Sequence, residues 1–423
     1  MKNYLNGLNR ELKQLILLAQ SIALEQGISA YLVGGFVRDL ILKAKNLDLD
    51  IVVEGNGIKF AEEFSCRLGA KLIRHKRFAT ATLILRSGIK LDIASARKEF
   101  YPKPAALPQV IPGNLRDDSY RRDFSINAMA IGLSGKDAGR LIDYFHGQED
   151  LRSKKIRILH SLSFIDDPTR ILRAIRFEQR YNFKIEPDTL KNLKKAARLK
   201  MLEKTEPQRL RDELIPVLKE KTVLKQIKRL RELVGFAFIN KRLLLSPKNR
   251  VLFKAAESQI NWFKKTYPKR RGLDSWLIYF MALLDSLATR DIKSVCRRFA
   301  FRKGEAKRIL NYKQSNRVIM GELHRSQVKP AKIFSLLEPL SYEAILLIKA
   351  KSKDKKINKY IADFFKIYNG MCISVSGDDL RKLGILPGPY YQGIFAKILQ
   401  AKLNGKISTK EQELAFIKKI YRY

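Results

Sequence analysis

Residues 30–53 read AYLVGGFVRDLILKAKNLDLDIVV, and this stretch decides the first part of the fold. The apolar run 30–33 predicts a strand that ends at the glycine pair Gly34-Gly35. Residues 37–43 then predict a short helix, and residues 48–53 predict a second strand. A glycine pair between a strand and a helix lets the backbone turn tightly, and the first N–H groups of the helix can receive a phosphate. The stretch therefore predicts an α/β unit with a phosphate-binding turn.

Two aspartates open the second strand. Alternation along a strand places the carboxylates of Asp48 and Asp50 on one face, with Leu49 on the other. Two repelling carboxylates at the mouth of a buried strand are readily explained by divalent cations, and such a pair can hold two Mg²⁺ ions for phosphoryl transfer. Asp92, on a later apolar run, is a candidate third ligand. The alternative is a pair of strand-end aspartates that face solvent.

Strand and helix patterns continue outward from this stretch as far as residue 150. Helices are predicted at 11–25 and 58–68, and further strands at 80–85 and 90–94. Beyond residue 150 almost no alternating segment remains, and amphipathic patterns rich in lysine and arginine predict long helices. The clearest of these are 167–181, 187–200, 207–219, 274–287 and 411–421. We therefore expect an α/β head followed by a helical arm.

The composition of the chain indicates the kind of partner. The chain has 423 residues, 45% of them hydrophobic, which is enough to bury real cores and excludes a disordered basic tail. Its formal net charge is +42. Residues 1–150 hold 22 basic and 17 acidic side chains, whereas the remainder holds 62 and 25, a net charge of +37. Such an excess indicates a polyanion, nucleic acid first and an anionic membrane surface second; the alternative is a solvated basic surface without a partner.

Cysteine usage and hydropathy bear on the compartment. The three cysteines lie far apart, which argues against a disulfide framework and fits a reducing compartment. The first residues lack an apolar segment followed by a cleavage site. The longest strongly apolar run, 276–284, has only about half the length that crosses a bilayer. We therefore expect a cytoplasmic protein with no membrane association and no obligate protein partner.

Two arginine-rich blocks follow the carboxylate pair. Residues 121–130 read RRDFSINAMA, and residues 166–177 read DDPTRILRAIRF. In the second block an arginine recurs every three residues, so successive arginines are neighbours on a helix, and Asp167 lies near the same face. The alternative is a basic stripe that faces solvent, with Pro168 in the first turn.

In this order and spacing the motifs resemble those of the class II tRNA nucleotidyltransferase and bacterial poly(A) polymerase family, within the DNA polymerase β-like nucleotidyltransferases. The resemblance rests on the glycine turn GGFVRD, the Asp-x-Asp pair and both arginine blocks, and it covers about residues 30–180. Residues 375–380 (VSGDDL) and 383–389 (LGILPGP) are similar to the C-terminal region of CCA-type enzymes and extend the resemblance over most of the chain. One departure is Asp166, where the family commonly has a glutamate.

The resemblance implies an α+β fold, in which a polymerase β-like α/β head precedes an elongated all-α neck, body and tail. The implied bounds are 1–150 for the head, 151–220 for the neck, 221–330 for the body and 331–423 for the tail. Asp48 and Asp50 would be the catalytic residues and would hold two Mg²⁺ ions. The implied nucleotide-binding residues are Gly35, Arg38 and Arg122 at the triphosphate, Asp167 and Arg170 at the base, and Arg173 and Arg176 in support of both.

The pairing edges of cytosine and adenine explain how such a neck could select them without a template. Both present an exocyclic amine donor beside a ring-nitrogen acceptor. A carboxylate at Asp167 can accept from the amine, and the guanidinium of Arg170 can donate to the ring nitrogen. Guanine and uracil present an oxygen where the amine should be, and that oxygen would face the carboxylate with no proton between them. The planar fork of arginine suits this task better than lysine does.

The leading hypothesis is therefore a template-independent tRNA nucleotidyltransferase that adds C, A or both to the tRNA 3′ end from CTP and ATP and releases pyrophosphate. The basic arm would hold the tRNA acceptor arm through phosphate and shape contacts. Whether the enzyme adds CCA, CC or only A stays open; the block 97–118 lies where the family has a flexible loop linked to that choice. The alternatives are a poly(A) polymerase with the same head and a catalytically inactive RNA-binding protein.

Overall fold

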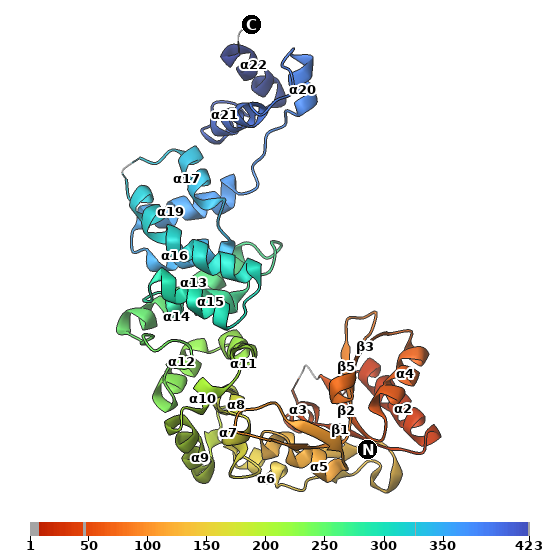
Figure 1. Ribbon diagram of the computed structural model, residues 1–423. Coiled ribbons are helices and arrows are strands. Elements are labelled where there is room, and N and C mark those ends of the chain that lie inside the picture. Colours follow the sequence, from red (N-terminus) through yellow and green to blue (C-terminus); the bar gives the residue numbers. More distant parts are fainter. Residues whose placement is uncertain (1–7, 45–47, 326, 422–423) are drawn as a thin grey trace. The chain divides into compact units, whose positions relative to one another are not determined.

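The computed structural model describes residues 8–44, 48–325 and 327–421. The chain divides into two compact units, Met1–Phe238 and Ile239–Tyr423. Within the described residues, every strand belongs to the first unit, and the second unit is helical (Figure 1). This order confirms the prediction of an α+β chain in which helices follow an α/β head.

A seven-stranded mixed sheet forms the head of the first unit, in the order β3-β4-β5-β2-β1-β8-β9. The pair β2 and β5 is parallel, whereas the other neighbouring pairs are antiparallel. The strands are β1 (Ser29–Val33), β2 (Leu49–Glu54), β3 (Lys71–His75), β4 (Thr80–Ile84), β5 (Lys90–Ser95), β8 (Ala130–Gly132) and β9 (Leu141–Ile142). The four predicted strands are confirmed, and each of their ends lies within one residue of its predicted position.

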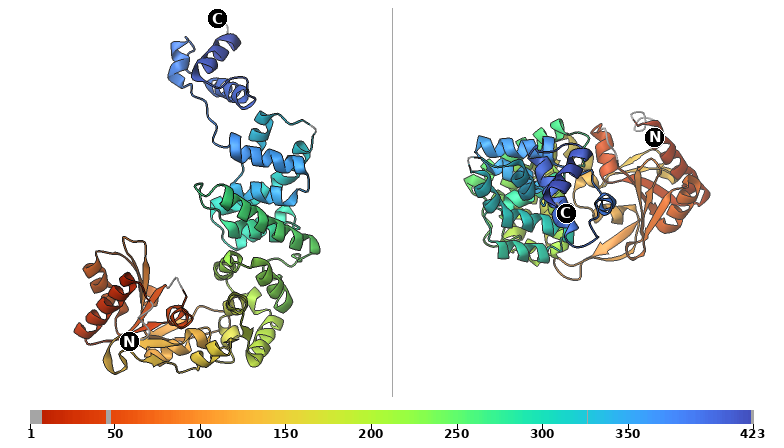
Figure 2. Two further views of the ribbon diagram at one scale, coloured as in Figure 1. Left: turned by 180° about the vertical axis from the view of Figure 1, so that it is seen from behind. Right: turned by 90° about the horizontal axis from the view of Figure 1, so that it is seen from above.

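Helices and short 3₁₀ turns surround this sheet. They are α2 (Arg10–Glu25), α3 (Gly35–Ile41), α4 (Gly57–Leu68), η1 (Lys76–Phe78), α5 (Leu115–Tyr120), η2 (Ser125–Asn127) and η3 (Gly135–Asp137). The helices α2 and α4 pack on one side of the sheet (Figure 1; Figure 2). Tyr31 and Val33 point the other way and form a small core with Leu115 of α5. The site described below lies on this second side.

Residues 97–118, where the resemblance places a flexible loop, form a hairpin and the start of a helix. The hairpin pairs β6 (Arg97–Phe100) with β7 (Gln109–Pro112) in antiparallel register, and α5 follows. A capping box begins α5, since Asn114 and Asp117 each accept from the other's backbone N–H. The sequence analysis missed this hairpin together with β3, β8 and β9. The reason is physical, because β3 is a mostly exposed strand and β8 has only three residues.

Helices make up the rest of the first unit. They are α6 (Gly147–Arg152), α7 (Ser163–Asp166), α8 (Thr169–Tyr181), α9 (Pro187–Arg198), α10 (Met201–Lys204), α11 (Pro207–Lys219) and α12 (Val223–Leu233), beside the short ladder of β10 (Lys155–Ile156) and β11 (Lys184–Ile185). Proline begins α9 and α11, where its missing N–H has no intrahelical partner to lose. The helix α8 packs against α11 and α12, and its arginines Arg173 and Arg176 pair with Glu213 of α11.

The second unit is built from helices around two cores. Its elements are α13 (Pro247–Thr266), α14 (Ser275–Leu284), α15 (Thr289–Arg298), α16 (Lys303–Leu323), α17 (Pro330–Leu337), α18 (Tyr342–Lys351), α19 (Lys355–Asp363), η4 (Phe364–Tyr368), α20 (Gly377–Lys382), α21 (Tyr391–Leu403) and α22 (Lys410–Ile420). The apolar helix α14 is buried from Trp276 to Leu284 and packs against α13, α16 and α18, as predicted for a core helix. A smaller core, with Leu380, Ile398 and Ile417, joins α20 to α22. None of the helices in the described ranges combines the length and the hydropathy needed to cross a membrane.

Candidate active site

The turn between β1 and α3 brings the backbone close to two functional side chains. Gly34 has a left-handed φ of +68°, and a Cβ atom there would lie 2.6 Å from Nη1 of Arg122 and 3.5 Å from Oδ2 of Asp50. Glycine alone both adopts this φ easily and leaves the space free. Gly35 is the first residue of α3 and lines the pocket of the site. Gly34 therefore lets Arg122 approach Asp50.

The strand-end carboxylates lie on the side of the sheet away from α2 and α4. Asp50 and Val52 lie two residues apart on β2 and therefore share a face of the sheet. Val52 belongs to the small core on this side. Asp92 on β5 is the register partner of Asp50, so its side chain leaves the sheet on the same face. Burial raises the pKa of Asp50 to about 7; Arg122 opposes the rise, and Asp92 and Asp48 add to it. A nearby cation would favour the ionised form of such a buried carboxylate.

These carboxylates suit a Mg²⁺ site that has few protein ligands. Within the described residues, no three His, Cys, Asp or Glu side chains converge as a complete metal cage. Mg²⁺ ordinarily takes only one or two carboxylates and completes its octahedron with water and substrate phosphates. Asp48 and Asp50 both line the pocket and match that requirement. Asp92 lies outside the lining, and its Oδ1 accepts from the hydroxyl of Thr82 at 2.6 Å.

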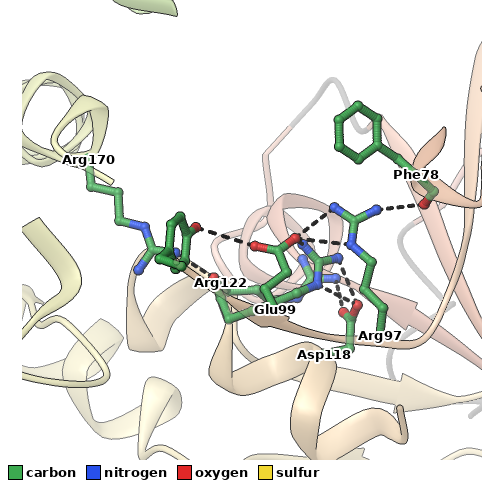
Figure 3. A network of polar contacts seen from close by, with 8 residues as sticks. Phe78, Arg97, Glu99, Asp118, Arg122 and Arg170 are labelled. Atoms are coloured by element: carbon green, nitrogen blue, oxygen red, sulfur yellow. Dashed lines mark hydrogen bonds and ion pairs between the residues drawn. The ribbon is translucent and has the colours of Figure 1, made fainter. Parts of the chain in front are cut away.

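A network of charged side chains holds Arg122 in place (Figure 3). Asp118 is fully buried and accepts from Nη2 of Arg122 at 2.8 Å and from Nη2 of Arg121 at 2.7 Å. Burial alone would raise the pKa of Asp118, but Arg122 and Arg121 outweigh it and lower that pKa. Arg121 and Arg97 also donate to Oε1 of Glu99, at 3.2 and 2.8 Å. The orientation of the Arg122 guanidinium is therefore set by its neighbours before any ligand binds.

Arg38 is the most enclosed of the predicted triphosphate ligands, with 5% of its surface exposed. Its Nε and Nη2 each donate to Asp39 at 2.8 Å, and its Nη1 donates to Oδ1 of Asn127. The guanidinium carbon lies 5.2 Å from the ring centroid of Phe177 and 5.0 Å from that of Tyr181, both on α8. These hydrogen bonds engage three of the five guanidinium N–H groups and leave two. Arg38 therefore ties α3 to α8 while it lines the pocket.

Asp167 and Arg170 lie together at the start of α8. Oδ1 of Asp167 accepts from the N–H of Thr169 at 3.1 Å, from its hydroxyl at 2.6 Å and from Nη2 of Arg209 at 2.8 Å. Among the described residues, none donates a hydrogen bond to Oδ2 of Asp167. Arg170 is buried, and its Nη2 donates to the carbonyl oxygen of Arg121 at 2.6 Å. Both side chains line the pocket with part of their hydrogen-bonding capacity left.

Arg173 and Arg176 continue along the same side of α8. Arg173 donates to Asp123 at 2.7 Å and to Glu213 of α11 at 3.1 Å. Burial would raise the pKa of Asp123, but Arg173 and the hydrogen bond from Asn127 outweigh it and lower that pKa to about 2. Nε of Arg176 is buried and has no hydrogen-bond partner within the part of the chain that the structure describes. Arg173 is thus braced by carboxylates, whereas Arg176 keeps an unused donor at the pocket.

One pocket of about 670 Å³ collects all the site residues that the sequence predicted. They are Gly35, Arg38, Asp48, Asp50, Arg122, Asp167, Arg170, Arg173 and Arg176. The lining also contains residues that the sequence analysis did not assign, among them Glu99, Tyr101, Arg121, Asp123, Asn127, Arg209 and Glu213. Three of these stand in the block RRDFSIN, so a signal was present for them. Arg209 and Glu213 carried no signal beyond a helical pattern.

The fold and the pocket together define a class of protein. A mixed α/β head presents two strand-end carboxylates beside a glycine turn, and a helical wall faces the same pocket with a row of arginines. Carboxylates that can hold Mg²⁺ and arginines that can bind phosphate are the parts needed for nucleotidyl transfer. The class is that of the nucleotidyltransferases.

Comparison with known proteins narrows this class. The family model described as the poly(A) polymerase head domain matches residues 30–157, and the one described as a probable RNA- and SrmB-binding site of polymerase A matches residues 182–243. The A-adding tRNA nucleotidyltransferase of Geobacter sulfurreducens is 37% identical over 92% of this chain and 45% of its own. That of Halalkalibacterium halodurans is 31% identical over 97% of this chain and 93% of its own. The CCA-adding enzyme of Thermotoga maritima, solved in complex with tRNA, is 35% identical with a TM-score of 0.74, over 99% of this chain and 98% of its own.

The chain belongs to the class II tRNA nucleotidyltransferase family. It spans less than half the length of the Geobacter relative.

Proposed function

We propose that the protein is a template-independent nucleotidyltransferase that adds C, A or both to the 3′ end of tRNA and releases pyrophosphate. One observation carries the proposal. The carboxylate pair Asp48 and Asp50 and the base-reading pair Asp167 and Arg170 line the same pocket. A pocket of this kind can hold the triphosphate of a nucleotide at one end and its base at the other.

At the triphosphate end, Asp48 and Asp50 would hold two Mg²⁺ ions, whose charge would balance the negative charges of Asp92 and Asp48 beside Asp50. Bound Mg²⁺ would promote ionisation of the attacking 3′-hydroxyl and neutralise charge on the leaving pyrophosphate. Arg122, held by Asp118 and directed at the glycine turn, would bind a phosphate oxygen. Gly35 lets the backbone approach the same phosphates. The two N–H groups that Arg38 has left would serve the triphosphate as well.

At the base end, selection would rest on the acceptor Asp167 and the donor Arg170. Oδ2 of Asp167 is the oxygen that would accept from the exocyclic amine of cytosine or adenine. Arg170 would donate to the adjacent ring nitrogen. Arg173 and Arg176, which both line the pocket, would support the nucleotide from the same helix. UTP and GTP would place an oxygen against a carboxylate and bind weakly.

The RNA would follow the basic helices away from this pocket. A groove of about 790 Å³ in the first unit shares Arg176 and Arg180 with the pocket. Lys219, Lys221 and Lys225 also line it, and Glu220 is its single acidic residue. This charge favours the phosphates of the RNA strand that carries the reacting end.

We further propose a division of labour along the chain. The head, residues 1–150, would carry catalysis, and the neck, 151–220, would read the base. The body, 221–330, and the tail, 331–423, would bind tRNA, in keeping with the net charge of +37 beyond residue 150. Cys66, Cys296 and Cys372 are unpaired, which fits a reducing compartment, and we place the protein in the cytoplasm.

The number of nucleotides that the protein adds, CCA, CC or only A, is a question for experiment. The Geobacter and Halalkalibacterium relatives are A-adding enzymes, and the Thermotoga relative is a CCA-adding enzyme. A poly(A) polymerase would use the same head with ATP alone and a less specific RNA. The experiment is to incubate the protein and Mg²⁺ with tRNA that ends before CCA, after C or after CC, offering each nucleotide singly and in combination. Extension of generic RNA ends with no preference for tRNA would contradict the proposal, and no extension at all would favour an inactive RNA-binding protein.

A further inference from the structure

A single guanidinium connects the base-reading carboxylate with the opposite wall of the pocket. Nη2 of Arg209, on α11, donates to Oδ1 of Asp167 at 2.8 Å. Nη1 of the same side chain donates to the carbonyl oxygens of Ala105 and Ala106, at 3.2 and 3.3 Å. These two alanines lie between β6 and β7 of the hairpin. Arg209 therefore contacts both the residue that would read the base and the hairpin segment beside it.

The contacts of Arg209 decide which oxygen of Asp167 faces a nucleotide. Oδ1 of Asp167 receives three donors, the N–H and the hydroxyl of Thr169 and the Nη2 of Arg209. Three donors exhaust the in-plane capacity of one carboxylate oxygen. Oδ2 is left as the oxygen for an exocyclic amine. Thr169 is the first residue of α8, two positions after Asp167, whereas Arg209 comes from another helix. The two together therefore prevent rotation of the carboxylate.

The hairpin segment is held against the neck at the same place. Ala105 is buried and has a left-handed φ of +62°, which is uncommon for a residue with a side chain. Its N–H donates to the carbonyl oxygen of Ile165 at 3.0 Å, two residues before Asp167. Tyr101 and Pro108, on either side of this anchor, line the pocket. The distance between the base-reading carboxylate and this wall is thus set by Ile165 and Arg209.

We propose that Arg209 is a specificity-determining positioning residue for nucleotide selection, and this inference rests on the proposed function. Its guanidinium orients Asp167 so that Oδ2 meets the amine of cytosine or adenine, and it holds the wall of residues 101–108 at a fixed distance from that oxygen. The planar fork makes both sets of contacts at once, which the single ammonium of a lysine does not. Without Arg209 the carboxylate can turn and the wall can move, so a base with an oxygen in place of the amine is tolerated. The reacting phosphate lies elsewhere in the pocket, so chemistry with the correct nucleotide is largely kept.

The test compares kcat and KM for CTP, ATP, UTP and GTP in the full-length wild-type protein and in two variants, Arg209→Ala and Arg209→Lys, on the tRNA end that the wild type extends. In Arg209→Ala the preference for the accepted nucleotide over UTP and GTP should fall about tenfold or more. KM for the accepted nucleotide should rise, while KM for tRNA stays the same. Arg209→Lys keeps a charge near Asp167 and should recover part of the selectivity. Arg211→Ala is the matched control, because Arg211 stands on the same helix and pairs with exposed Asp212 at 2.8 Å.

A double-mutant cycle with Thr169→Val adds a readout that general stability does not affect. Thr169 and Arg209 restrain the same oxygen, so their effects on selectivity should be non-additive. Unchanged selectivity in Arg209→Ala and Arg209→Lys, with only kcat or the melting temperature reduced, would overturn the inference and leave the proposed function standing. A wild-type protein that transfers no nucleotide would overturn both. Should Arg209→Ala not fold, Arg209→Lys and the Thr169 variant still decide the matter.

Discussion

The carboxylates of Asp50 and Asp92 leave neighbouring parallel strands at the same register and on the same face of the sheet. Asp50 lines the pocket, whereas Asp92 is exposed beside it and accepts from the hydroxyl of Thr82. The two carboxylates are therefore unequal, since Asp50 lines the pocket and Asp92 adds negative charge outside its lining.

We expect this inequality to appear in the magnesium dependence. Asp50→Asn should reduce nucleotide transfer by at least about a thousandfold while tRNA binding persists, because it would remove one of the two carboxylates that we propose hold Mg²⁺. Asp92→Asn should instead raise the Mg²⁺ concentration that gives half the maximal rate by about 10- to 100-fold. Initial rates over a Mg²⁺ titration measure both effects, and Asp212→Asn, an exposed aspartate of α11, is the control. An unchanged Mg²⁺ dependence in Asp92→Asn would show that Asp92 takes no part.

Arg38 should contribute to the stability of the first unit as well as to the site. Arg38→Met removes the guanidinium donor of Asn127 and leaves Asp39 with only the hydroxyl of Tyr181, which donates to its Oδ1 at 3.1 Å. Breaking a buried ion pair in this way costs about 3–5 kcal/mol, and the 17% exposure of the Asp39 side chain puts the expected loss near the lower end. Scanning calorimetry should show the transition of the first unit at a lower temperature.

The tryptophans provide the control for the Arg38 variant. Trp262 and Trp276 are the two tryptophans of the chain, and both belong to the second unit. The unfolding transition followed by their emission should therefore stay where it is in the wild type. If it shifted as far as the calorimetric transition of the first unit, the assignment of the loss to local contacts of Arg38 would be wrong.

Binding of tRNA should depend steeply on salt, and nucleotide selectivity should not. For a nucleic-acid duplex, each phosphate contact adds about −0.9 to the slope of the logarithm of the binding constant against the logarithm of the salt concentration. Replacing Lys221 and Lys225 of the basic groove by alanine should reduce the slope by about two units. Titrations of labelled tRNA at several salt concentrations measure it, with alanine at the exposed head lysines Lys59 and Lys71 as control. A slope that is the same in both double variants would exclude the groove as an RNA contact.

Lys349 and Trp262 should report pH within the second unit. Nζ of Lys349 lies 3.2 Å from the ring centroid of Trp262, and burial lowers the pKa of this amine from its ordinary 10.5 to about 8. Between these two values the unfolded chain binds a proton that the folded chain has lost. The stability of the second unit should therefore rise with pH from about 8 to about 10.5.

Fluorescence measures the same group directly. In a Trp276→Phe background, the emission of Trp262 should change with a midpoint near pH 8, because the ammonium over the ring becomes a neutral amine. Lys349→Met should abolish that change, and Lys351→Met, on the same helix but bonded to Asp285, should preserve it. A midpoint close to the ordinary lysine pKa of 10.5 would contradict the conclusion that burial lowers the pKa of Lys349.

The parts of the site that the sequence predicted share one property. The shared face of Asp48 and Asp50 follows from strand alternation, and the neighbouring positions of the α8 arginines follow from helical spacing. Each of these relationships is local, within a few residues of one element. The functional roles of these residues came from the family resemblance. The structure adds that β2 and α8 face the same pocket, and local sequence patterns do not report this arrangement.

The missed residues have partners far along the chain. Arg209 bonds to Asp167 and Ala105, which lie 42 and 104 residues away. Asn127 receives the guanidinium of Arg38 from 89 residues away. Such pairs depend on how strands and helices pack, and no periodicity within one element reports them. The exposed strand β3 was missed for a related reason, since it lacks the buried face that produces alternation.

Gly34 illustrates how a missing group of atoms can act in a site. The volume that a methyl group would fill at this position is the volume that Nη1 of Arg122 occupies. An alanine here would strain the turn and would also displace the end of a side chain 88 positions later in the sequence. The absence of a side chain at position 34 therefore determines where the positive charge of Arg122 lies in the pocket.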